Sequence, residues 1–163
     1  MRIAILQLLS LLMLSSASWH AQAEAAPIIA IIVSSDAQIA PQQMIEPNEL
    51  SLIYWRKKLY LDGGQQVHPV NLHAEHPLRL AFSTAVLKSQ PKDQTDYWNG
   101  VYFHGISPPR SLLSEEAVIR YVTETKASIG YINACLLDAR VKPILWIAKE
   151  KIMTTPPESI DCH

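Results

Sequence analysis

A continuous apolar run covers positions 27–33, with the sequence PIIAIIV, and the polar residues Ser34, Ser35 and Asp36 end it. The run is rich in β-branched residues and does not alternate with polar ones. Such a run is typical of a strand that is covered on both faces. The pattern therefore predicts a central parallel strand at this point of the chain.

Further along, apolar residues recur at the spacing of a helix with one buried face. Three such helices are predicted, one from Pro47 with Leu50, Ile53 and Tyr54, one from about Pro77 with Leu78, Phe82, Ala85 and Val86, and one after Ser114 with Val118, Ile119 and Val122. Residues 93–103 form a fourth predicted helix that carries Tyr97, Trp98, Tyr102 and Phe103. At helical spacing, aromatic side chains are more typical of core packing than of ligand stacking.

Residues 67–72, 129–132 and 143–147 are predicted strands, because short β-branched and aromatic runs there lie between turn residues. Pro69 cannot donate a ladder hydrogen bond, which favours an edge position or a bulge. With the helices between them, these strands predict one mixed α/β domain, a mixed sheet flanked by helices.

The start of the chain has the three parts of a secretory signal peptide: Arg2, an apolar core at 3–14, and the small-residue site Ala21-Gln22-Ala23. The core is shorter than the roughly 20 residues that a membrane span needs. We expect cleavage after Ala23, so that 1–23 is the signal peptide and 24–163 the exported domain. In a Gram-negative host the location would be periplasmic, without a membrane span after cleavage.

Composition narrows the function classes further. The 163 residues carry a formal net charge of −1 and are 48% apolar, which fits a globular chain. A broad nucleic-acid-binding face needs a clear excess of Lys and Arg, so we expect no nucleic acid partner. No cofactor is expected either.

Cys135 and Cys162 are the only two cysteines. An oxidising compartment would allow them to form a disulfide that ties the C-terminal tail to the body. The alternative is a buried Cys135 with a free Cys162, and the sequence favours neither.

Three groups of residues could carry chemistry. His73 and His76, with Glu75 between them, could bind a metal ion, but a third or fourth ligand is missing nearby, which favours a solvated loop. The helix start after Leu72, with Arg79 one turn in, could hold an anion or be an ordinary helix start. Ser34, Ser35 and Asp36 lack any motif for nucleophilic catalysis, so we expect no enzyme.

Several segments resemble, in order and spacing, the small exported relatives of the phosphate-binding protein of the phosphate ABC transporter. The segments that carry this resemblance are 48–54, 77–82, Tyr97-Trp98, 103–105, 108–110 and 129–132. The resemblance implies a single lobe of the type 2 periplasmic-binding-protein fold, where full-length relatives pair two lobes.

In those relatives an arginine precedes a Ser-Gly-Thr element that holds phosphate. The matching stretch here, residues 72–78, lacks the hydroxyls and the glycine, and it includes Glu75 and Pro77, which argues against tight phosphate binding. The resemblance implies a substrate-binding-like transport protein that holds a small anion near Ser34, Ser35, His76 and Arg79 without turnover. The alternative is a ligand-free interaction module that docks on a membrane sensor or transporter.

Overall fold

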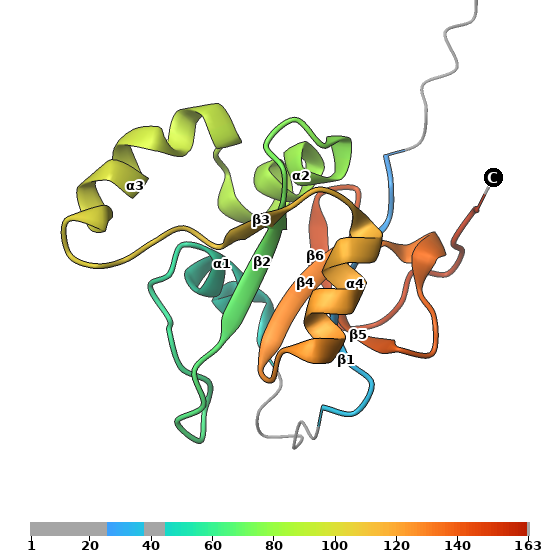
Figure 1. Cartoon of the computed structure of the whole chain (residues 1–163). Helices are drawn as coiled ribbons and strands as arrows, with labels where there is room; N and C mark the ends of the chain where they lie inside the picture. Colours follow the sequence, from blue (N-terminus) through green and yellow to red (C-terminus); the bar gives the residue numbers. More distant parts are fainter. Residues whose placement is uncertain (1–25, 38–44, 163) are drawn as a thin grey trace, which may run out of the picture.

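The run at positions 27–33 forms strand β1, Ile29–Ser34, inside a six-stranded sheet of order β3-β2-β4-β1-β5-β6. The computed structural model describes residues 26–37 and 45–162 (Figure 1). The predicted signal peptide and its cleavage site after Ala23 lie outside the described residues.

The prediction of a central parallel strand, covered on both faces, is confirmed in part and wrong in part. Each residue of Ile29–Ile32 is at most 1% exposed, so the strand is covered on both faces as expected. It is central, between β4 and β5, but antiparallel to both neighbours, so the expected parallel pairing is wrong. A continuous apolar run reports that both faces are buried and carries no information about the direction of the neighbouring strands.

The remaining elements agree with most of the predicted ones. The strands are β2 (His68–Leu72), β3 (Arg110–Leu112), β4 (Ser128–Asn133), β5 (Val141–Ala148) and β6 (Lys151–Met153). The helices are α1 (Pro47–Tyr54), α2 (Pro77–Phe82), α3 (Thr95–Tyr102) and α4 (Glu115–Glu124), with a π-helix η2 (Ser83–Leu87) and 3₁₀ turns η3 (Pro91–Gln94) and η4 (Ala134–Leu136). β3 and β6 were not predicted, because each is three residues long and too short for a periodic signal.

Two neighbouring residues of β4 show how the helices cover the sheet. A Cβ added to Gly130 would lie 2.5 Å from Val118 Cγ1 of α4, so the glycine lets this helix approach one face closely. Tyr131 points to the opposite face, where its ring stacks on that of Phe82 with 4.0 Å between centroids. The Phe82 ring in turn lies 4.6 Å from that of Tyr54 in α1. α4 therefore covers one face of the sheet, and α1 and α2 cover the other.

α3 stands apart from the sheet (Figure 1). No residue of the helix is buried, and it is held by Tyr97 and Trp98, whose rings pack against Trp55. Tyr102 is 64% exposed and Phe103, directly after the helix, is 87% exposed. The core interpretation of the aromatic residues is therefore wrong for these two. Of the helices in the described ranges, none combines the length and the apolar character that a membrane crossing requires.

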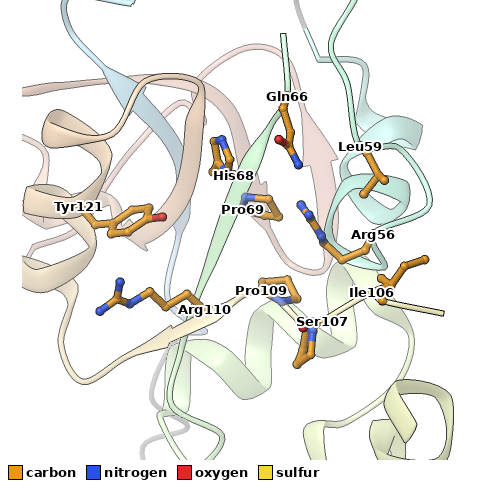
Figure 2. Close-up of a pocket in the computed structure, with 12 residues that line it drawn as sticks. Arg56, Leu59, Gln66, His68, Pro69, Ile106, Ser107, Pro109, Arg110 and Tyr121 are labelled. Atoms are coloured by element: carbon orange, nitrogen blue, oxygen red, sulfur yellow. The ribbon is translucent and has the colours of Figure 1, made fainter. Parts of the chain in front are cut away.

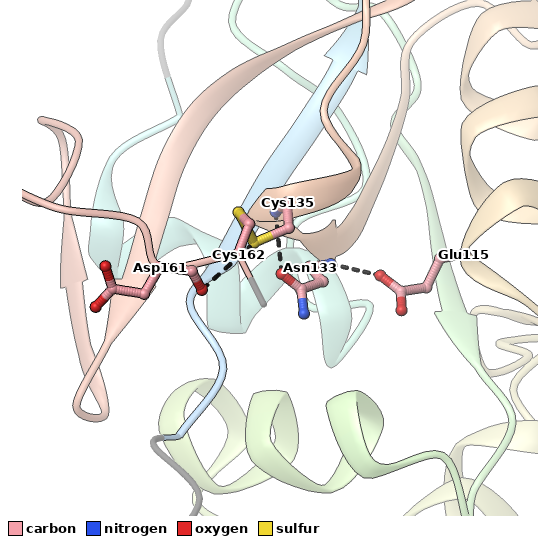
Figure 3. Close-up of a disulfide and its surroundings, with 5 residues drawn as sticks. All are labelled: Glu115, Asn133, Cys135, Asp161 and Cys162. Carbon is pink, nitrogen blue, oxygen red and sulfur yellow. Dashed lines mark hydrogen bonds between the residues drawn. A yellow bond between two sulfur atoms is a disulfide. The ribbon is translucent and has the colours of Figure 1, made fainter.

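A disulfide joins Cys135, in η4, to Cys162 in the C-terminal tail, with 5.6 Å between their Cα atoms. The residue before the turn, Asn133, caps it by accepting a hydrogen bond from the Cys135 N–H (Figure 3). Its own N–H is held by the Glu115 carboxylate of α4. Of the two alternatives that the sequence left open, the structure has the bridged pair, which ties the tail to the end of β4.

We expect the double variant Cys135→Ser/Cys162→Ser to lose about 3 kcal/mol of unfolding free energy, because the bridge closes a loop with a sequence separation of 27. Urea denaturation of the oxidised wild type and the variant measures the difference. Adding a reductant should shift the wild type to the midpoint of the variant and leave the variant unchanged. Equal midpoints for oxidised wild type and variant would contradict a stabilising role for the bridge.

Candidate functional site

The four residues expected to form one anion site lie at two ends of the sheet. β1 is antiparallel to β4, and β4 is parallel to β2, so β1 ends where β2 begins. Ser34 and Ser35 therefore lie at the amino end of β2, whereas His76 and Arg79 follow its carboxyl end. The strand length between the ends is on the order of 15 Å. The structure does not bring the two serines together with His76 and Arg79, because the antiparallel direction of β1 was not visible in its sequence.

Arg79 lies one turn into α2, and only 6% of the residue is exposed. Its guanidinium is held by two neutral side chains: Nη1 donates to Asn71 Oδ1 at the end of β2, and Nη2 donates to Gln94 Oε1 at 3.2 Å. The sequence predicted either an anion site or an ordinary helix start here, and neither prediction included a buried arginine. Arg79 is an interior cation that links β2, α2 and η3.

The side-chain oxygens of Asn71 and Gln94 each accept a further hydrogen bond. The Tyr131 hydroxyl donates to Asn71 Oδ1 at 3.3 Å and accepts the Leu72 N–H at 3.1 Å. Gln94 Oε1 also accepts the Trp98 indole N–H at 3.3 Å. Neither Asn71 nor Gln94 was among the residues predicted to form a site. Asn71 could have been suspected only because it is a polar residue between the apolar Val70 and Leu72 of a predicted strand. Nothing in the sequence around Gln94 indicated its role.

The charge of Arg79 has no counter-charge in direct contact. In the part of the chain that the structure describes, no carboxylate forms an ion pair with it. Burial raises the pKa of the Tyr131 hydroxyl, while the nearby Arg79 charge acts in the opposite direction. Burial also raises the pKa of Tyr54 well above its usual value. Both phenols are therefore neutral at physiological pH, and the guanidinium is balanced by neutral oxygens only.

His73 and His76 lie between β2 and α2, with 5.3 Å between their ring centroids. The Nδ1 of His76 accepts the Leu78 N–H at 3.2 Å and so caps the helix, which leaves Nε2–H as the ring donor. His73 Nδ1 lies 3.3 Å from a carboxylate oxygen of Glu75, and this contact lowers the pKa of Glu75. Over the described ranges, no group of three or more His, Cys, Asp or Glu is arranged to hold a metal ion.

The fold is that of phosphate-binding proteins of known structure. An ABC-type phosphate transport receptor from Vibrio cholerae matches with a TM-score of 0.55 at 17% identity, over 74% of this chain and 47% of its own. A putative phosphate ABC transporter substrate-binding protein from Clostridium perfringens, solved with bound phosphate, matches with a TM-score of 0.56 at 15% identity, over 74% and 46%. The chain thus spans less than half the length of these neighbours. No protein-family model and no curated protein matches its sequence.

A double-mutant cycle tests whether Asn71 and Arg79 act as a pair. We expect Asn71→Leu alone to cost about 3 kcal/mol of unfolding free energy, because it leaves a buried guanidinium without its main acceptor. The double variant Asn71→Leu/Arg79→Met should cost at least 1 kcal/mol less than the sum of the single variants, since the second change removes the stranded charge. Urea denaturation gives all four values. Additive effects would show that the two side chains are not coupled.

Proposed function

We propose that this chain is an exported, solute-binding-like protein that binds a small inorganic or organic anion at the carboxyl end of β2 without chemical turnover. The proposal keeps His76 and Arg79 of the expected site and leaves out Ser34 and Ser35. It includes periplasmic export through the signal peptide of residues 1–23 and an association with a membrane transporter. The fold of the phosphate-binding neighbours supports it at the level of architecture.

The observation that carries the proposal is the uncompensated charge of Arg79. A guanidinium in a low-dielectric interior costs free energy unless it is well paired, and neutral oxygens compensate it less than an anion does. An anion bound within reach of the guanidinium would supply the missing charge. The Nε2–H of His76, three residues earlier in the chain at the start of α2, is a second donor for an anion.

Two features of the same loop favour weak binding. Pro77 has no N–H to donate. The first backbone N–H of the helix, that of Leu78, already donates to His76 Nδ1 and is not available to an anion. The carboxylate of Glu75 adds a negative charge that would repel an anion. The proposed ligand is therefore a small anion held mainly by side chains, and phosphate is one probe among several.

Calorimetry on the exported protein with inorganic phosphate, sulfate and acetate at low salt tests the proposal. We expect at least one of these anions to bind, and Arg79→Gln to weaken that binding by about tenfold or more, because a charged donor is lost. Arg79→Lys keeps the positive charge and should weaken anion binding less than Arg79→Gln does. Glu75→Gln removes the repelling carboxylate and should strengthen binding.

Arg120→Gln is the matched control, since Arg120 is an exposed arginine on α4. Circular dichroism and the thermal midpoint of each variant separate a lost site from a lost fold. The proposal fails if no anion gives heat with the wild type, or if Arg120→Gln weakens binding as much as Arg79→Gln.

A second candidate function, docking on a membrane sensor or transporter, is favoured by α3. This helix buries none of its own residues, and Tyr102 and Phe103 at its end present aromatic surface to solvent. Exposed aromatic side chains are enriched at protein interfaces and often dominate their binding energy.

Cross-linking in intact cells followed by purification of the protein tests this second function. We expect a membrane-protein adduct with the wild type and its loss in Tyr102→Ser/Phe103→Ser, because the exposed aromatic rings are removed. Leu113→Ser is the control, since Leu113 is also 83% exposed but lies outside α3. An adduct that is retained in the double variant would exclude this surface as the docking site.

A further inference from the structure

A pocket of about 400 Å³ lies at the amino end of β2, at the opposite end of the strand from Arg79. Figure 2 shows β2 as its floor, with Arg56 on one side and Arg110 below Tyr121 on the other. The loop of residues 105–109 closes the lower side. The residues that line the pocket include Arg56, His68, Pro69, Pro109, Arg110 and Tyr121.

Prolines keep this gap open. β2 and β3 pair in parallel from Val70 and Arg110 onward, and the same register would place Pro69 opposite Pro109. Neither residue has an N–H to donate, so the ladder cannot extend toward the start of β2. The segment before β3 leaves the sheet, and the edge of β2 beside His68 stays uncovered on that side. The cavity is therefore built into the sequence of both segments.

Arg56 occupies a position that ordinarily favours glycine. It follows α1 with a φ of 57°, and its N–H bonds to the Ile53 carbonyl while the Lys57 N–H bonds to that of Leu52. These two bonds form a Schellman cap, in which a left-handed residue without a Cβ is the usual choice. An arginine held in this conformation points to a role for its side chain.

The guanidinium of Arg56 is fixed and partly desolvated. Its Nη1 donates to the Val67 carbonyl at 3.1 Å, and Figure 2 shows the group directed toward the floor of the pocket near Pro69. Burial lowers its pKa from the ordinary value, with no carboxylate acting in the opposite sense. Partial removal of water strengthens the attraction between a cation and a bound anion.

Arg110 and Tyr121 form the other side. The Arg110 guanidinium carbon lies 5.7 Å from the centroid of the Tyr121 ring, a cation–π contact that holds an otherwise exposed side chain over the pocket. Neither arginine makes an ion pair with any described residue, and the described lining contains no Asp or Glu. His68 adds a third basic group.

We propose that this pocket binds a small organic anion, with its carboxylate or phosphate group at Arg56 and an apolar body along Pro69 and Pro109 toward Tyr121. Two unpaired arginines supply charge-assisted donors, and the prolines supply apolar walls. The volume is within the range of small-molecule sites. The site is independent of the anion site proposed at the carboxyl end of β2.

Calorimetry on the exported protein at low salt, with phenyl phosphate, benzoate and the neutral benzyl alcohol, tests this site. We expect one or both organic anions to bind and benzyl alcohol not to bind. Arg56→Gln and Arg110→Gln should each weaken binding by about tenfold. Arg120→Gln, an exposed arginine outside the pocket, should leave it unchanged. In the wild type, an NMR titration should shift the ring resonances of His68 and Tyr121, which locates the ligand without any variant.

Arg79→Gln distinguishes the two sites. If both proposals hold, this change weakens the binding of inorganic phosphate, sulfate or acetate and leaves the binding of phenyl phosphate or benzoate unaffected, while Arg56→Gln does the reverse. The pocket proposal is overturned if neither organic anion binds the wild type, if benzyl alcohol binds as tightly, or if Arg120→Gln weakens binding as much as Arg56→Gln. Ring shifts at His73 and His76 in place of His68 and Tyr121 would overturn it as well.

Discussion

A guanidinium that is almost fully buried must find its hydrogen-bond partners inside the protein, and Arg79 finds them on two different segments. Asn71 lies one residue before the end of β2 and Gln94 ends η3. The two hydrogen bonds of the Arg79 guanidinium therefore fix where α2 and the segment before α3 lie relative to the sheet. Tyr131 extends the network to β4 through Asn71. Because both partners are neutral amides, the contacts that order this end of the sheet leave the Arg79 charge without an ion pair among the described residues.

The direction of β1 is the second constraint, and it divides the polar residues between the two ends of the sheet. Ser34 and Ser35 lie at the end of the sheet where β2 begins, with β4 between β1 and β2, and the pocket of Arg56 and Arg110 lies at the same end. His73, His76 and Arg79 lie at the other end. Each end therefore has its own set of basic side chains, and a ligand at one of them does not touch the other. The two proposed anion sites are separable for this reason.

Sequence patterns were sufficient for the helices and strands with a clear period. The stripes of α1 and α4 and the continuous run of β1 are confirmed as buried surfaces. Short elements such as β3 escaped detection, because pairing with β2 and not periodicity defines them. For the candidate site, Arg79 and His76 could be named in advance. Gln94 could not, because its role depends on a contact with a residue 15 positions earlier in the chain.

The sequence by itself determined that the longer apolar segments would be buried, since apolar spacing reports burial directly. It also supplied the two cysteines and the prolines that limit pairing. Only the tertiary structure decided that Cys135 and Cys162 meet, that β1 runs against its neighbours, and that Arg79 is an interior cation. These outcomes depend on contacts between residues far apart in the chain, and local spacing does not encode the distance or the direction in which such segments come together.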